Sequence, residues 1–141
     1  MKIAIASDHG GYNLKQTILE YLKDKYEIVD FGTYTQESCD YPLYAKKVVD
    51  AILHDKFERG ILICGTGIGM AISANRHKGI RAANVSDTFS ARMTRMHNDS
   101  NILTLGERVI GSGLAKDIVD IWLNTKYDGG RHQKRIEMLD E

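Results

Sequence analysis

Cys64 is the residue whose surroundings point most directly to chemistry. It ends an apolar run and precedes a loop in which glycine stands at 65, 67 and 69. Glycines so spaced let backbone N–H groups converge on an anion or a developing oxyanion. A helix N-terminus lowers the pKa of a thiol from its free value of about 8.5. Cys64 is therefore either a base or nucleophile or, like most free cysteines, a small buried hydrophobic residue.

The glycine loop does not match three well-known phosphate-binding or phosphatase loops. A P-loop continues with Lys and then Ser or Thr, whereas Met70 and Ala71 follow Gly69. The dinucleotide fingerprint has another spacing and follows the first strand, whereas this loop follows the third predicted strand. A cysteine phosphatase carries arginine at the position of Met70. A tight strand-to-helix turn is the structural alternative, and the glycines alone do not decide between the two.

Other polar residues are candidates for the same site. His97 and Asn98 end a predicted helix, where the histidine is either a general acid or base or a solvated helix-terminal residue. Asp8 and His9 follow the first predicted strand and either hold hydroxyl groups or cap the next helix.

A group of arginines near the C-terminus has the chemistry of a phosphate clamp. Arg131 and Arg135 are four residues apart and share one helical face, with His132 beside them. Guanidinium groups bind phosphate through paired hydrogen bonds, and Arg108 is a third candidate. The alternative for each is solvent-facing charge.

We expect no metal ion and no cofactor. His54 and His77 are isolated, and no His or Cys pair has the spacing of a zinc site. Cys39 lies in a polar loop with no evident partner, and we interpret it as incidental. Two cysteines are too few for a secreted disulfide scaffold, so a reducing cytoplasm is expected.

The elements that position these residues alternate along the chain. Short β-rich runs predict five strands at 3–7, 27–31, 60–64, 81–85 and 101–105. Helical spacing predicts helices at about 14–22, 42–53, 70–75, 87–96, 114–122 and 130–139. This order predicts an α/β protein, a single domain over 1–141 with a Rossmann-like, five-stranded parallel sheet between two helix layers.

Such a sheet binds ligands beyond the carboxyl ends of its strands. We expect three segments to meet there, namely Asp8-His9-Gly10-Gly11, the loop after Cys64, and Met96-His97-Asn98 before the fifth strand.

The composition of the chain argues against nucleic acid and membranes as partners. The 141 residues include 19 basic and 19 acidic side chains, so no net field attracts nucleic acid or a membrane surface. The N-terminus has no signal-peptide layout, and no apolar run approaches the roughly 20 residues of a spanning helix. We therefore expect a cytoplasmic protein with neither nucleic acid nor membrane as partner.

The chain resembles the type B ribose-5-phosphate isomerases, a family that also contains allose-6-phosphate and galactose-6-phosphate isomerases. The resemblance runs over nearly the whole chain. It rests on residues 7–11, Asp30-Phe31-Gly32, Asp40-Tyr41-Pro42, residues 63–70, Asn75, residues 79–83 and His97-Asn98.

The resemblance implies a homodimer, sometimes paired into a tetramer, with sugar-phosphate sites at the subunit interface. It also implies roles for individual residues. Cys64 would be the proton-transferring base, His97 would open the furanose ring, and the loop would hold the enediolate oxygen through Gly65, Thr66, Gly67, Ile68 and Gly69. Substrate contacts would come from Asp8, His9, Tyr41 and Asn98, and phosphate contacts from Arg108, Arg131 and Arg135.

The chemistry of an aldose–ketose isomerase agrees with these roles. The reaction moves a proton between adjacent carbons through an enediolate, so it needs one base, donors for the oxyanion and an anchor for the phosphate. Retention of Cys64, His97 and both C-terminal arginines favours ribose 5-phosphate over the other family substrates. A sugar-phosphate-binding module without catalysis and a cysteine hydrolase remain alternatives.

Overall fold

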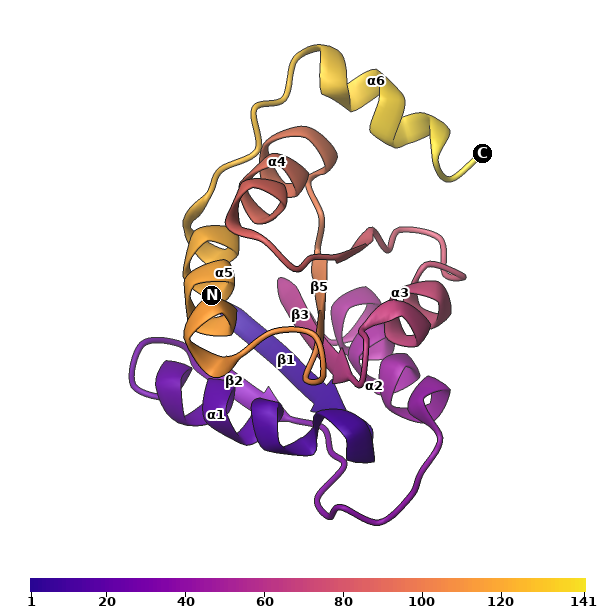
Figure 1. Cartoon of the computed structure of the whole chain (residues 1–141). Helices are drawn as coiled ribbons and strands as arrows, with labels where there is room; N and C mark the ends of the chain where they lie inside the picture. Colours follow the sequence, from indigo (N-terminus) through magenta and orange to yellow (C-terminus); the bar gives the residue numbers. More distant parts are fainter.

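A computed structural model describes the whole chain, residues 1–141. Its elements follow the predicted order, strands alternating with helices (Figure 1). The strands are β1 (Lys2–Ser7), β2 (Glu27–Asp30), β3 (Arg59–Cys64), β4 (Ala82–Asn84) and β5 (Ile102–Gly106). The helices are η1 (His9–Gly11, a 3-10 turn), α1 (Tyr12–Leu22), α2 (Tyr41–His54), α3 (Ile68–Ala74), α4 (Thr88–Asn98), α5 (Ser112–Asn124) and α6 (Arg131–Met138).

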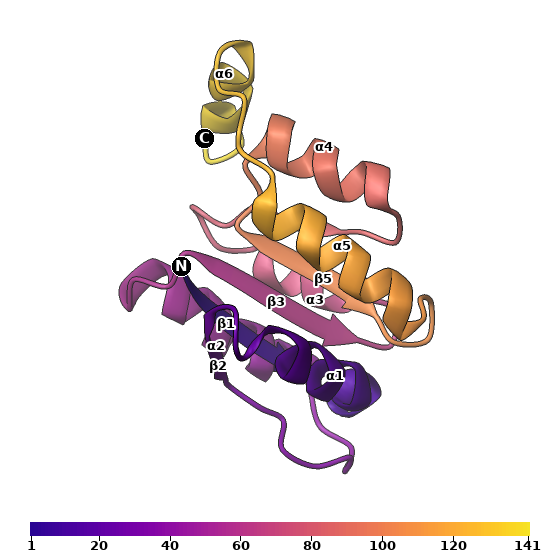
Figure 2. The ribbon, with the colours of Figure 1, turned by 90° about the vertical axis from the view of Figure 1, so that its left-hand side faces the viewer.

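All strand pairs are parallel, and the sheet order is β2-β1-β3-β5-β4. Helices α1, α4 and α5 cover one face and α2 and α3 the other, which confirms the three-layer α/β/α prediction (Figures 1 and 2). Helix α6 covers neither face and extends beyond α4 (Figures 1 and 2). No helix combines the length and apolar character that a membrane crossing requires.

The central strand β3 is buried on both faces because both of its sides are apolar. Ile61 and Ile63 pack into the core beneath α1 and α5, which contains Trp122. Leu62 and Cys64 point into the opposite core, against α2 and α3. This burial confirms that the apolar run before Cys64 is the middle strand of a parallel sheet.

Local signals set several helix starts. Asp87 caps α4 by accepting a hydrogen bond from the Ser90 N–H at 2.8 Å. Pro42 stands in the first turn of α2, where a missing N–H costs nothing. Both helices begin within one residue of their predicted starts at 42 and 87, and no strand bound differs from its prediction by more than one residue.

One expectation about the binding edge is wrong. Met96-His97-Asn98 lies at the amino edge of the sheet, because it precedes β5. Gly60 pairs with Ile102 and Cys64 with Gly106, so four strand residues separate the two edges. At about 3.3 Å per residue, that separation is roughly 13 Å along the strands. His97 and Asn98 therefore do not join the Cys64 loop of their own chain.

Candidate active site

The sulfur of Cys64 is fixed by its own loop. Cys64 ends β3 with only 6% of its surface exposed, and the Gly67 N–H donates a hydrogen bond to Sγ at 3.0 Å. Gly67 has a φ of 82°, a left-handed conformation that favours glycine. A Cβ there would also lie 2.4 Å from the Asn84 side chain. The sequence therefore needs glycine at this position to turn the backbone amide onto the sulfur.

The same loop presents backbone donors that the chain itself leaves unused. Thr66 Oγ1 accepts from the Ile68 N–H at 3.2 Å, which closes the turn before α3. The amides of Gly65, Thr66 and Gly69 have no acceptor within the chain. These N–H groups belong to the loop that holds the sulfur, and free backbone donors of this kind can stabilise a developing oxyanion. Gly67 differs from these three residues, because its N–H already donates a hydrogen bond to the Cys64 sulfur.

The N-terminal turn lies against this loop, as the sequence predicted. Asp8 Oδ1 accepts from the Gly10 N–H at 2.9 Å and so caps η1. A Cβ on Gly10 would approach the Gly65 nitrogen to 3.2 Å, so the two backbones nearly touch. Asp8 therefore has a capping role that does not depend on substrate, and its second carboxylate oxygen forms no hydrogen bond within the chain.

Cys39 lies beside His9, a neighbour that the sequence did not reveal. Its backbone N–H donates to Nδ1 of His9 at 3.2 Å, and its sulfur lies 3.9 Å from the same nitrogen. A ring nitrogen that accepts carries no proton, so this contact assigns the proton of neutral His9 to Nε2. Loop 35–40 thereby presents His9 to the site as a hydrogen-bond donor.

The carboxyl end of β5 completes the wall around Cys64. Glu107 N–H donates to the Cys64 carbonyl and Arg108 N–H to the Gly65 carbonyl, each at 3.0 Å. The Glu107 carboxylate accepts from the Leu14 N–H at 2.6 Å, which ties the start of α1 to this wall. A Cβ on Gly65 would lie 3.3 Å from the Arg108 guanidinium, so this arginine reaches over the loop.

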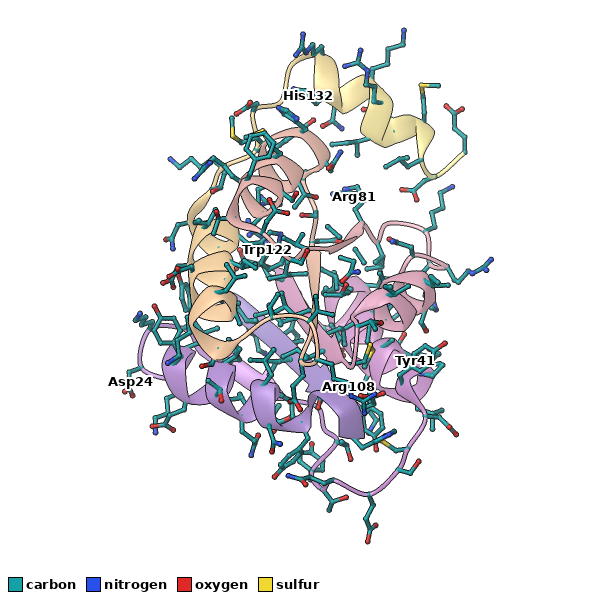
Figure 3. The ribbon with its side chains drawn as sticks, in the orientation of Figure 1. Asp24, Tyr41, Arg81, Arg108, Trp122 and His132 are labelled. Atoms are coloured by element: carbon teal, nitrogen blue, oxygen red, sulfur yellow. The ribbon has the colours of Figure 1, made fainter.

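Tyr41 lies on the other side of the loop, where it packs against Gly69. A Cβ on Gly69 would come within 2.8 Å of the Tyr41 ring. Figure 3 shows Tyr41 and Arg108 at the same end of the molecule and His132 at the other.

His97 belongs to a second cluster, at the opposite edge. Its ring stacks on that of His132, with centroids 4.4 Å apart and planes inclined by 17°. Side-chain ligand atoms of His97, Asp128 and His132 lie within 4.8 Å of one another. Sequence spacing could not reveal this three-residue group, because its members come from α4, α6 and the segment between α5 and α6.

Burial and neighbouring positive charge both act on His132 in this second cluster. Partial burial lowers the pKa of His132, and the neighbouring His97 and the Arg131 guanidinium lower it further. Asp128 opposes this effect, whereas Arg135 adds to it. Arg131 and Arg135 are both exposed on α6, as a phosphate clamp requires. The surroundings of His132 therefore disfavour the protonated form of its imidazole.

The predicted site residues thus form two groups within one chain. The first surrounds Cys64 and consists of Asp8, His9, Tyr41, Gly65, Thr66, Gly67, Ile68, Gly69 and Arg108. The second lies at the amino edge and consists of His97, Asn98, Arg131 and Arg135. Glu107 and the backbone of Cys39 also belong to the first group, and the sequence did not reveal their contacts, because these join residues far apart in sequence.

A doubly wound α/β/α fold whose middle strand ends in a cysteine and a glycine-rich loop defines a class of small enzymes with the site at the carboxyl edge of the sheet. The chain belongs to the ribose/galactose isomerase family, whose sequence profile matches residues 3–139. It is 48% identical to ribose-5-phosphate isomerase B of Escherichia coli over 139 residues, 98% of this chain and 93% of that one.

Two further comparisons bear on fold and substrate. The crystal structure of a ribose 5-phosphate isomerase from Thermotoga maritima superposes with a TM-score of 0.97 at 54% identity, covering 99% of this chain and 97% of that one. D-erythrulose-4-phosphate isomerase of Pectobacterium atrosepticum is 43% identical over 141 residues, 99% of this chain and 93% of the relative.

Proposed function

We propose that this protein interconverts ribose 5-phosphate and ribulose 5-phosphate, with Cys64 as the proton-transferring base. The observation that carries the proposal is the Cys64 loop, in which a fixed sulfur lies among unused backbone donors. Membership of the ribose/galactose isomerase family and the likeness to ribose-5-phosphate isomerase B support the same reaction.

The proposed proton transfer uses the residues around β3. The Cys64 thiolate takes the proton from carbon two of the open-chain aldose, and those electrons form the carbon–carbon double bond of an enediolate. The amides of Gly65, Thr66 and Gly69 stabilise the charge that develops on oxygen. A proton then moves between the two substrate oxygens, and Cys64 returns its proton to carbon one to give the ketose.

Ring opening requires a second chain. His97 is the proposed acid–base group for the furanose ring, yet it lies at the edge of the sheet opposite Cys64. Arg131 and Arg135 lie with it, whereas Arg108 lies with Cys64. We infer a twofold dimer in which His97, Asn98, Arg131 and Arg135 of the partner subunit complete the site around Cys64.

The exposed surface between the two edges supports this dimer. Ile68 and Ile72 are four residues apart on α3 and are 53% and 54% exposed, although both are large and apolar. Helix α3 lies between the loop after Cys64 and α6 (Figure 1). A twofold axis near this helix would bury both isoleucines and bring each α6 towards the partner's Cys64 loop.

Related sugar phosphates are the competing substrates. The relative from Pectobacterium atrosepticum is a D-erythrulose-4-phosphate isomerase, so similar chains act on sugars of other lengths. Allose 6-phosphate and galactose 6-phosphate are the further alternatives. We also propose that the protein works in the cytoplasm, where its two free cysteines stay reduced.

The test is a panel of aldose phosphates assayed for isomerisation with the wild type and Cys64→Ala. Ribose 5-phosphate should be converted fastest, and Cys64→Ala should lose activity while it still binds substrate. Cys39→Ala is the control, because it keeps the backbone N–H that His9 uses and should be nearly silent. Near-normal turnover by Cys64→Ala would refute the mechanism, and a faster reaction with another sugar phosphate would correct the substrate.

A further inference from the structure

The backbone at the end of α4 is firmly held, but the His97 side chain depends on another element. Arg95 is buried and donates to the Asp99 carboxylate at 2.9 Å and to the Ser100 carbonyl at 2.6 Å. It also reaches the Thr125 carbonyl at 3.3 Å. The His97 ring, by contrast, forms no hydrogen bond within the chain and is half-buried against His132. The stack with His132 therefore restricts the plane of the His97 ring.

The three-residue group does not have the geometry of a metal site. The rings of His97 and His132 are nearly parallel, and nitrogen lone pairs lie in the ring planes. Two stacked rings therefore direct their lone pairs side by side, without a shared point for an ion. Arg131 and Arg135 add positive charge beside His132, which opposes a cation further. The arrangement instead suits a supporting role, in which the His132 ring is a flat aromatic surface, here called the plate, against which the His97 ring packs.

Helix α6 carries this plate and buries little of its own surface against the fold. Ile136 is its one buried residue. Gly129 and Gly130 precede it with φ values of 68° and 58°, so the chain enters α6 through two residues with wide backbone freedom. The Asp128 N–H donates to the Met96 carbonyl at 3.1 Å and anchors the segment just before these glycines. Beyond α6, the Asp140 carboxylate accepts from the Gly79 N–H at 3.1 Å. A ligand bound to the exposed side of α6 would add a restraint between these two anchored ends.

We propose that His132 is a positioning residue that couples phosphate binding to ring opening. This inference rests on the proposed function, in which Arg131 and Arg135 bind the phosphate and His97 opens the ring. Phosphate held by the two arginines fixes α6, and α6 fixes the His97 ring through His132. The remote phosphate then contributes to the rate of ring opening as well as to affinity.

The test compares three variants of α6. His132→Ala removes the plate, and His132→Phe keeps an aromatic ring without a titratable nitrogen. Met138→Ala is the control, because Met138 lies on the same helix and is 56% exposed. We expect kcat for ribose 5-phosphate to fall at least about tenfold in His132→Ala, part of the usual worth of acid–base assistance. It should recover in His132→Phe, with KM little changed. For the phosphate-free sugar ribose, the variants should differ much less.

A measurement without turnover separates this inference from the proposed reaction. In ¹H–¹³C NMR spectra, the ring current of the stacked partner should shift the His97 ring signals in the wild type and in His132→Phe. Inorganic phosphate should sharpen and move these signals further, because it restricts α6. In His132→Ala both effects should vanish while phosphate still binds. An unchanged His97 response in His132→Ala would overturn the coupling, even if the isomerase assay succeeds. The expected NMR pattern would support it even if ribose 5-phosphate is not the substrate.

Discussion

Gly106→Ala is a sharp test of how closely β5 supports the catalytic loop. Gly106 pairs with Cys64, and a Cβ on it would lie 2.6 Å from the backbone carbonyl of Thr66. Ordinary contact begins at 3.4 Å, so the loop must move by 3.4 − 2.6, about 0.8 Å. Overpacking of this kind costs about 1–3 kcal/mol of unfolding free energy. A displacement near 1 Å costs about 10²-fold in rate, so we expect kcat/KM to fall by about 10–100-fold.

Gly111→Ala is the matched control for this prediction. Gly111 lies five residues further along, has an extended backbone with φ of −80°, and has nothing within 4 Å of an added Cβ. Steady-state kinetics and urea unfolding of both variants are the assays. If Gly106→Ala stays within twofold of the wild type in kcat/KM, the close approach of β5 to the loop does not position Cys64.

Three further predictions concern the cluster at the amino edge of the sheet. Arg131→Ala or Arg135→Ala removes a charge-assisted contact of about 1.5–3 kcal/mol, so inorganic phosphate should inhibit the variants roughly 10–100-fold more weakly. Unchanged inhibition would show that these arginines are only solvent-facing charges. His97→Asn should slow net conversion of ribose 5-phosphate by about 10²–10⁴-fold but spare hydrogen exchange in open-chain ribulose 5-phosphate. Equal losses of conversion and exchange would instead place His97 in the proton-transfer step. The pKa of His132 is lowered on folding, so the unfolded chain binds more protons and stability should fall as pH drops below about 6.5. Urea unfolding at pH 7.5 and 5.5 should show a smaller fall for His132→Phe than for the wild type, and an equal fall would assign the effect elsewhere.

Much of the fold could be predicted because its signals are local. The apolar run that ends at Cys64 indicated a buried central strand, and helical spacing placed the starts of α2 and α4 within one residue. These features depend on neighbours a few residues away. The contacts that shape the site do not: Glu107 reaches Leu14, and Cys39 reaches His9 across 30 residues. No local pattern in the sequence reports such pairings.

The prediction for the position of His97 is wrong, and the order of elements in the sequence already contains the physical reason. A residue just before a parallel strand lies at the amino edge, and only three residues separate Asn98 from Ile102. Because α4 ends at Asn98 and β5 begins at Ile102, His97 lies beside the start of that strand. The prediction grouped His97 with Cys64 and overlooked this order of elements, so the proposed site, which uses both residues, needs a second chain.

Subunit complementation tests the two-chain site most directly. Cys64→Ala and His97→Asn should each be nearly inactive alone. When the two variants are unfolded together and refolded as a mixture, half of the dimers should pair one chain of each kind, and one of their two sites should hold both Cys64 and His97. The mixture should then regain about a quarter of the wild-type activity on ribose 5-phosphate. If Cys64 and His97 act within one chain, no dimer contains an intact site, and the mixture would stay as inactive as its components.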